Sequence, residues 1–283
     1  MNSRLGWRKF VNAFMLTLTG LCALLSVSVL LIVLGYLGWN GWQYLTWTFL
    51  THLPAAVGET GGGMANAIIG SGKLLLVAAV TGIPTGLLGG IYLAEFGGKT
   101  FTFMVRYSAD LLNGVPSIVM GIFAYTVVVL PMRHFSALAG GLALGIMLIP
   151  IVLRSTEDFL RAVPNPLREG ALALGASKWK AIATIVIPAS IRAIATGSLL
   201  ALARVAGETA PLLFTSFNNQ FWSHGFNQPT ASLPVMIYEY AISPYPDWHR
   251  QAWAAGFILL MLVLIANVGA RLILSRKSPA LRG

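Results

Sequence analysis

Long apolar runs separated by short polar segments dominate this chain. A helix needs about 20 mainly apolar residues to cross the hydrocarbon core of a bilayer, and six runs approach or exceed that length. The predicted spans are Val11–Leu37, Ile68–Leu93, Tyr107–Leu130, Leu138–Leu153, Ile191–Phe217 and Ala252–Leu274. The pattern predicts an all-α integral membrane protein with six transmembrane helices. An even number of spans places both termini on one side of the membrane.

Composition and charge agree with this prediction. The 283 residues are 56% hydrophobic and only 10% charged, with a mean hydropathy of +0.74, a balance that a soluble domain of this size could not hide from water. The net charge of +10 would suggest a polyanion partner, but 15 of the 19 basic residues fall in segments that are inside if the amino terminus is inside. That asymmetry is the positive-inside rule. We therefore expect a multi-pass protein of a bacterial inner membrane, with both termini cytoplasmic and no nucleic-acid partner.

The first apolar run differs from a cleavable signal. It begins after Arg8 and Lys9 as a signal peptide would, but it is far longer than a signal h-region and no small-residue cleavage site follows. We expect residues 1–67 to form an uncleaved anchor helix and a flexible, glycine-rich outer loop, and residues 68–283 to form a transmembrane core. A second outer segment, residues 218–251, contains four prolines that oppose regular helix.

Metal and disulfide chemistry find little support in the sequence. Cys22 is the only cysteine and lies in the first span, so neither a disulfide nor a cysteine metal cluster is predicted. The four histidines are dispersed through predicted outer loops, where solvated loop residues are the simplest interpretation. We predict no metal site and no catalytic residue.

Several predicted spans are imperfect helices. Pro84 lies in the second span, Gly114 and Pro116 in the third, and Pro150 in the fourth. Each proline frees backbone groups that lipid cannot satisfy, so these helices must pack against protein or line a wet cavity. The sequence leaves close packing and a transport pathway as equal alternatives.

The inner loop at residues 154–191 has the highest charge density in the chain. Asn165, followed by proline, supplies an N-cap and a first-turn residue for a helix over Leu167–Leu174. Gly175 is the residue type favoured just past a helix end, and a second helix can start at Ser177. We expect a short helix, a bend and a further helix along the cytoplasmic side.

This loop carries a spaced pattern. Glu169-Gly170-Ala171 is followed by three residues, Gly175, nine residues, Ile185, one residue and Ile187-Pro188. The pattern resembles the EAA loop of ABC importer permeases, which reads E-A-A, three residues, G, nine residues and I-x-L-P. The glycine at the second position and the isoleucine before the proline are modest departures from it.

The resemblance implies a type I ABC importer permease with the MetI-like fold. In that family the loop is the coupling helix, which docks into a groove of a cytoplasmic ATPase. The ATPase-coupling residues are then Glu169, Gly170, Ala171, Gly175 and Trp179. Closure of the ATPase dimer would rock the spans attached to this loop.

The chain has no nucleotide site of its own. Gly70-Ser71-Gly72-Lys73 superficially resembles a phosphate loop, but Ala67 replaces the required first glycine and Leu74 replaces the Ser or Thr that holds magnesium. We therefore predict a subunit that is not an enzyme and binds no cofactor, with ATP and Mg²⁺ used by partner ATPase subunits. Lys73 is expected either to reach the lipid headgroups or to attract anions from outside.

Two charged residues lie in the fifth predicted span. Arg204 is thirteen residues from either proposed end, a costly position for a charge, and Glu208 follows one helical turn later on the same face. The two either neutralise each other or face a water-filled path. A guanidinium fits two phosphate oxygens at once, and Glu208 can accept the hydroxyl proton that phosphate carries and sulfate lacks at neutral pH. We hypothesise a substrate pathway formed by Arg204, Glu208 and Thr209.

Two motifs narrow the resemblance. The segment from Ala203 to Leu212 resembles the R-x-x-G-E-T-A-P-L signature of phosphate-specific permeases, and Gly114 to Gly121 resembles their G-V-P-S-I-V-x-G segment. The resemblance implies a homologous permease partner (PstC-like), two ATP-binding subunits (PstB-like) and a periplasmic or extracellular phosphate-binding protein (PstS-like). It also implies that the signature arginine takes part in phosphate passage. The expected function is phosphate import by alternating access.

Three alternatives stay open. A permease for another oxyanion, such as phosphonate or molybdate, fits the same features. A stand-alone secondary anion transporter or channel would explain Arg204 but not the EAA-like loop. An intramembrane hydrolase would need a base beside Ser71 or Ser198 inside the membrane, whereas the histidines lie in predicted outer loops.

Overall fold

The computed structural model describes residues 3–56, 59 and 61–276. Within these residues the chain is helical, and its only extended pairing is an isolated bridge between Pro54 and Gly62. Five helices in this part of the chain are long and apolar enough to cross a membrane, and a bent pair raises the number to six if it is one span. The prediction of an all-α membrane protein is therefore confirmed. The domain boundary after residue 67 stays a prediction.

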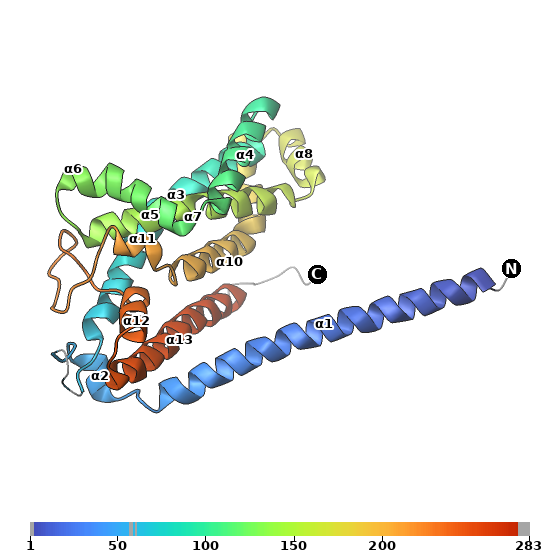
Figure 1. Cartoon of the computed structure of the whole chain (residues 1–283). Coiled ribbons are helices and arrows are strands. Elements are labelled where there is room, and N and C mark those ends of the chain that lie inside the picture. Colours follow the sequence, from blue (N-terminus) through green and yellow to red (C-terminus); the bar gives the residue numbers. More distant parts are fainter. Residues whose placement is uncertain (1–2, 57–58, 60, 277–283) are drawn as a thin grey trace.

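The first helix, α1 (Ser3–Trp42), stands away from the bundle (Figure 1). At a rise of about 1.5 Å per residue it is about 60 Å long, roughly twice the thickness of the hydrocarbon core. Near its C-terminal end, Gly41 lies against Trp253 and Phe257 of α13 (Pro246–Arg276). The helix extends beyond both ends of the predicted span Val11–Leu37.

The spans α3 (Ala65–Glu95) and α7 (Ala137–Arg161) pack closely against each other. Gly82, Gly86 and Gly90 share one face of α3, and a Cβ on any of them would lie only 2.6–2.8 Å from the nearest atom of α7. Small residues at this spacing allow two helix backbones to approach closely. Of the two alternatives that the sequence left open, packing accounts for this stretch of α3.

The third predicted span is broken into successive segments: α4 (Lys99–Gly114), α5 (Ser117–Ala124), the π-helical η1 (Tyr125–Val129) and α6 (Leu130–Met132). The part before the break and the part after it meet at 104°. The chain turns at Val115, which is extended because a residue before proline avoids the helical region, and Pro116 has no N–H to continue the helix. The prediction of one helix over Tyr107–Leu130 is wrong, and the break falls at its predicted imperfection.

The fifth predicted span is also interrupted. The helix α10 (Ile187–Val205) ends one residue after Arg204, and a turn leads to α11 (Ala210–Leu213). Glycine at 207 favours a helix end, and proline at 211 lies in the first turn of α11. The prediction of one helix over Ile191–Phe217, with Arg204 at its centre, is therefore wrong.

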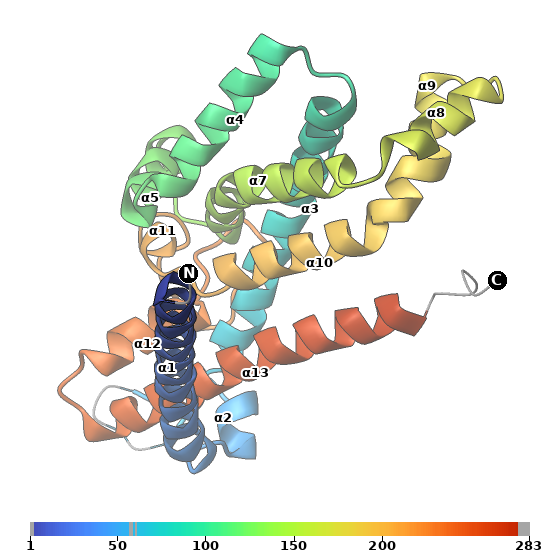
Figure 2. The ribbon, with the colours of Figure 1, turned by 90° about the vertical axis from the view of Figure 1, so that its right-hand side faces the viewer.

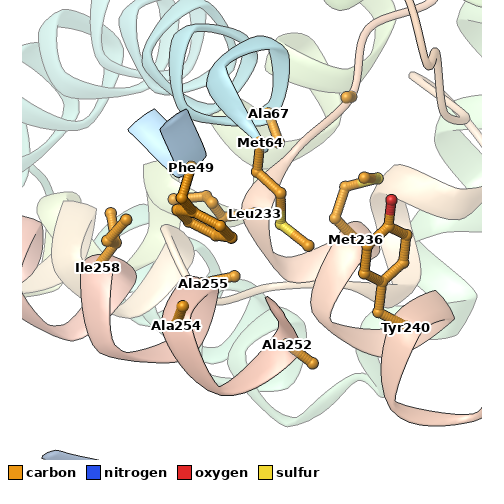
Figure 3. Packing of buried hydrophobic residues seen from close by; sticks show 11 residues of the cluster. Phe49, Met64, Ala67, Leu233, Met236, Tyr240, Ala252, Ala254, Ala255 and Ile258 are labelled. Carbon is orange, nitrogen blue, oxygen red and sulfur yellow. The ribbon is translucent and has the colours of Figure 1, made fainter. Parts of the chain in front are cut away.

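The end of the bundle that the charge asymmetry assigns to the outer side has an apolar core. Phe49 of α2 (Trp47–Thr51) and Met64 are buried against α12 (Leu233–Ala241) and the start of α13, as Figure 3 shows. The expectation of a wholly flexible loop before α3 is thus wrong for these residues. In the second outer segment, Pro234 begins α12 rather than opposing it, because a first-turn proline loses no helical hydrogen bond.

The predicted inner loop folds as α8 (Asn165–Ala173), α9 (Lys178–Ala181) and the π-helical η2 (Ile182–Val186), which runs into α10. These segments form a bend at the end of the molecule opposite α2 and α12 (Figure 2). We call α8 and α9, with the turn between them, the elbow. The predicted order of short helix, bend and helix is confirmed. The prediction of Asn165 as the N-cap is wrong, because Pro164 stands at that position and Asn165 is already helical, without a side-chain capping bond.

Candidate functional site

A cavity of about 220 Å³ lies where three parts of the chain meet. The junction of α4 and α5, the middle of α7 and the turn after α10 each contribute side chains. The lining residues are Leu112, Asn113, Val115, Ser117, Met147, Ile151, Arg204, Val205 and Glu208. Because both breaks in the predicted spans border this cavity, the irregular backbone lines a space rather than facing lipid, as the bilayer requires.

The two phosphate-permease motifs of the sequence meet at this cavity. Val115 and Ser117 belong to one motif, and Arg204 and Glu208 to the other. The motifs also touch beside the cavity, since a Cβ on Gly121 would lie 2.8 Å from the Cα of Pro211. Glycine at this position therefore lets α5 approach α11, which keeps the two motifs together.

Arg204 is exposed at the cavity and Glu208 is half-exposed. Among the described residues, no carboxylate oxygen lies within 4.0 Å of the Arg204 guanidinium. The expectation that Glu208 sits one turn later on the same helix face is wrong, because α10 has already ended at Val205. Within the part of the chain that the structure describes, the Arg204 guanidinium therefore forms no ion pair.

Thr209 is half-buried next to Glu208, but it is not among the residues that line the cavity. Its carbonyl accepts hydrogen bonds from the backbone N–H groups of Leu212 and Leu213, at 3.1 and 3.2 Å. Those bonds start α11 and fix the turn that carries Glu208. A direct contact between Thr209 and a substrate stays a prediction.

The elbow presents most of its motif residues to the surface. The exposed motif residues are Glu169, Gly170, Gly175 and Trp179, whereas Ala171 is buried. Gly175 has φ +83°, a left-handed conformation that favours glycine, and its N–H donates to the Leu172 carbonyl at 2.9 Å.

The sequence did not predict a cluster of ion pairs between α4 and α7. The arginines of this cluster had been assigned only to membrane topology. Glu157 is fully buried, and the Nε of Arg106 donates to its two carboxylate oxygens at 2.9 and 3.0 Å. Arg154 and Arg161 pair with the same carboxylate, at 3.3 and 3.1 Å, and Arg154 also pairs with Asp110 at 3.1 Å. The spacing of Arg154, Glu157 and Arg161 along one helix was the available signal.

Lys73 has a role that the sequence did not suggest. Its Nζ donates to the Ser223 carbonyl at 2.6 Å, to the Ser223 Oγ at 3.2 Å and to the Gly225 carbonyl at 3.3 Å. An ammonium has three donors, and all of them are used. Lys73 therefore ties α3 to the segment before α12, and its ammonium has no donor left to bind an anion directly.

The comparisons with known proteins agree with this geometry. Residues 86–279 match the family described as "Binding-protein-dependent transport system inner membrane component". The chain is 45% identical over 272 residues to the phosphate transport system permease protein PstA of Yersinia pestis, covering 96% of this chain and 92% of that protein. It is 43% identical over 277 residues to the protein of the same description from Haemophilus influenzae, covering 98% of both.

The fold has solved relatives as well. A chain of the MetNI methionine ABC transporter, in an inward-facing conformation, is similar with a TM-score of 0.58 at 15% identity, covering 77% of this chain and 95% of that one. This structural likeness supports the MetI-like fold. The sequence matches to PstA proteins identify a narrower family within it. The chain therefore belongs to the binding-protein-dependent transport system inner membrane component family and, within it, to the PstA permease proteins.

Proposed function

We propose that this chain is the membrane permease subunit of an ATP-driven phosphate importer. The observation that carries the proposal is the Arg204 guanidinium, which forms no ion pair with a described residue and lies at a cavity lined by both phosphate-permease motifs. The PstA relatives support phosphate as the imported anion.

In the proposed pathway, Arg204 binds the anion and Glu208 reads its protonation. The planar guanidinium donates to two phosphate oxygens. Glu208 accepts a hydrogen bond from the phosphate hydroxyl, which sulfate lacks at neutral pH, so the carboxylate repels sulfate and tolerates phosphate. Thr209 contributes to the pathway indirectly, because its backbone carbonyl fixes the turn that carries Glu208.

The energy comes from partners. The exposed elbow, with Glu169, Gly170, Ala171, Gly175 and Trp179, docks on two ATP-binding subunits of the PstB type, which use ATP and Mg²⁺. A homologous permease of the PstC type completes the membrane unit, and a phosphate-binding protein of the PstS type delivers phosphate from outside. This chain itself is not an enzyme and binds no cofactor. It crosses the bacterial inner membrane several times, with both termini in the cytoplasm.

Uptake by the reconstituted complex tests the proposal. Vesicles containing this chain and its partner permease, ATPase and binding-protein subunits should take up phosphate only with ATP. Replacing Arg204 by Ala should lower uptake by about tenfold or more, since hydrogen bonds to charged groups are worth about 1.5–3 kcal/mol. The matched control is Lys99→Ala, which also removes one exposed positive charge and should leave uptake unchanged.

The alternatives give different outcomes in the same vesicles. A secondary transporter would move phosphate without the ATPase subunits. A permease for another oxyanion would respond to phosphonate or molybdate and not to phosphate. Wild-type uptake by Arg204→Ala would remove this residue from the pathway.

A further inference from the structure

The first helix of the elbow, α8, is weakly held by packing. Ala171 is the buried residue of α8, while Leu167, Leu172 and Leu174 are exposed, the last at 91%. A helix with so little buried apolar surface gains little from the hydrophobic effect. If the elbow transmits force, a polar connection has to supply the stiffness.

Arg168 supplies such a connection. Its Nε and Nη2 donate to Glu95 Oε1 at 3.2 and 2.8 Å, and its Nη2 also donates to the Leu160 carbonyl at 2.6 Å. Its Nη1 donates to the Val163 carbonyl at 2.5 Å and to Asn165 Oδ1 at 3.4 Å. Every N–H of the guanidinium therefore has an acceptor, and the side chain is only 19% exposed.

Apart from Asn165 of α8 itself, the acceptors lie at the ends of two transmembrane helices. Glu95, whose side chain is 6% exposed, is the last residue of α3, and the Leu160 and Val163 carbonyls are at the end of α7 and just beyond it. A cation at a helix C-terminus also complements the helix dipole. Lys178 adds to the same junction by donating to the Glu95 carbonyl at 2.5 Å.

We propose that Arg168 is a positioning residue that joins the elbow to the α3–α7 pair as one rigid body. The proposal rests on the function proposed above. Movement of the elbow then reaches the cavity along two routes. One runs through α9 and η2 into α10, which carries Arg204. The other runs into α7, which the chain joins to α8 through residues 162–164 and which Arg168 stiffens; α7 contributes Met147 and Ile151 to the cavity wall.

Transport per ATP hydrolysed is the measurement that tests this role. In reconstituted complex, Arg168→Gln should keep ATP hydrolysis near the wild-type rate and lower phosphate moved per ATP by about fivefold, because the elbow still docks but its connection to α3 and α7 is no longer stiff. Arg168→Lys should lose nearly as much, since one ammonium cannot reach all of these acceptors. Lys99→Gln, which removes an exposed charge on the same side, should keep the wild-type ratio.

A cross-link provides the rescue. Cys22 is the only cysteine in the chain, so a Cys22→Ser background allows a Glu95→Cys, Arg168→Cys pair to be joined by a short bis-maleimide. The uncross-linked pair should be uncoupled, and cross-linking should restore most of the transport per ATP. If cross-linking instead leaves coupling lost, or if Arg168→Gln keeps the wild-type ratio, the rigid connection is overturned.

Failure of this inference is distinct from failure of the proposed function. If the wild-type complex does not couple ATP hydrolysis to phosphate uptake, the proposed function fails. If the wild type couples normally and the Arg168 variants do too, only the role of Arg168 fails. A role in folding alone would lower the yield of assembled complex and leave transport per ATP in that complex unchanged.

Discussion

Arginines occupy two regions of this molecule in opposite ways. At the cavity, Arg204 is exposed and forms no ion pair with any described residue. At the end that carries the elbow, Arg168 and Arg106 are bound to the carboxylates of Glu95 and Glu157, both almost completely buried. The same type of side chain is therefore unpaired at the cavity and bound to a buried carboxylate at the other end, within the described residues.

The contrast has a simple physical basis. A guanidinium whose donors are all satisfied must break those bonds before it can bind an anion, whereas an unpaired one only has to exchange water. Positive charge alone therefore does not locate an anion site. A guanidinium without an ion pair, a cavity and a break in the helix are the features on which the proposed site rests, and in the described chain Arg204 has all three.

The largest expected effect comes from breaking the paired region. Glu157→Gln leaves Arg106, Arg154 and Arg161 around a neutral side chain, and we expect a loss of about 2–4 kcal/mol of stability, since removing one partner of a buried ion pair leaves its charge uncompensated. The partial exposure of the arginines keeps the value at the lower end. Thermal unfolding of the purified complex in detergent measures it.

Glu208→Gln is the matched control at the cavity. It removes a carboxylate that forms no ion pair with the described arginines, so stability should change by no more than about 0.5 kcal/mol. Equal losses of stability in the two variants would abolish the distinction between the regions.

The next largest effect tests the body to which Arg168 is joined. In Gly86→Ala the added Cβ would lie 2.7 Å from the Val152 Cβ and 3.0 Å from the Ile149 carbonyl oxygen, so α3 and α7 must separate slightly. Overpacking of this kind costs about 1–3 kcal/mol. Gly72→Ala lies on the same helix with nothing within 4 Å of the new methyl group, and it should unfold at the wild-type temperature or slightly above it, since alanine favours a helix interior more than glycine does.

The sequence predicted the positions of the helices better than it predicted the breaks within them. Apolar runs and the EAA-like pattern were sufficient for the spans and for the elbow, including the bend at Gly175. The end of α10 was missed because the residues around it are as apolar as a span, and Gly207 with Pro211 was a weaker signal than the run itself. Hydrophobicity reports depth in the membrane, and it is blind to a turn that lines a cavity.

The candidate site divides in the same way. Arg204 and Glu208 were predicted from charge in an apolar run, and the structure brings them to one cavity, though not along one helix face. The contact of Arg168 with Glu95 joins residues 73 positions apart, and no local spacing encodes such a pair. For Lys73 the sequence suggested contact with lipid headgroups or attraction of anions from outside. The structure shows a third role, hydrogen bonds to a loop that is distant in the sequence.

An effect smaller than those above is expected when the positive charge at position 204 is kept but the planar shape of the guanidinium is lost. Arg204→Lys retains a cation but not the planar fork, so phosphate uptake should fall by about three- to tenfold and remain measurable. At Arg168 the same substitution should uncouple the complex nearly as fully as glutamine, because several fixed acceptors have to be served. Wild-type function of the lysine variant at both positions would mean that both arginines act only as point charges.

The smallest expected effect concerns a cation whose charge depends on pH. His134, between α6 and α7, has its Nδ1 2.7 Å from the Met132 carbonyl oxygen, and hydrogen bonds to Met132 and Asn227 raise its pKa above the ordinary value of 6.5. A raised pKa in the folded state means that protonation stabilises this contact. The stabilisation is complete below pH 6.5 and is lost as the pH rises through the folded-state pKa.

The segment around Asn227 should therefore resist proteolysis better at about pH 6 than at about pH 8, with the rate of cleavage in that segment as the measurement. His134→Gln should remove the difference, whereas His224→Gln, on the segment itself, should leave it in place. A difference that survives in His134→Gln would assign the pH dependence to another group. If the wild type shows no difference between the two pH values, the contact of His134 is equally stable with a neutral and with a protonated imidazole.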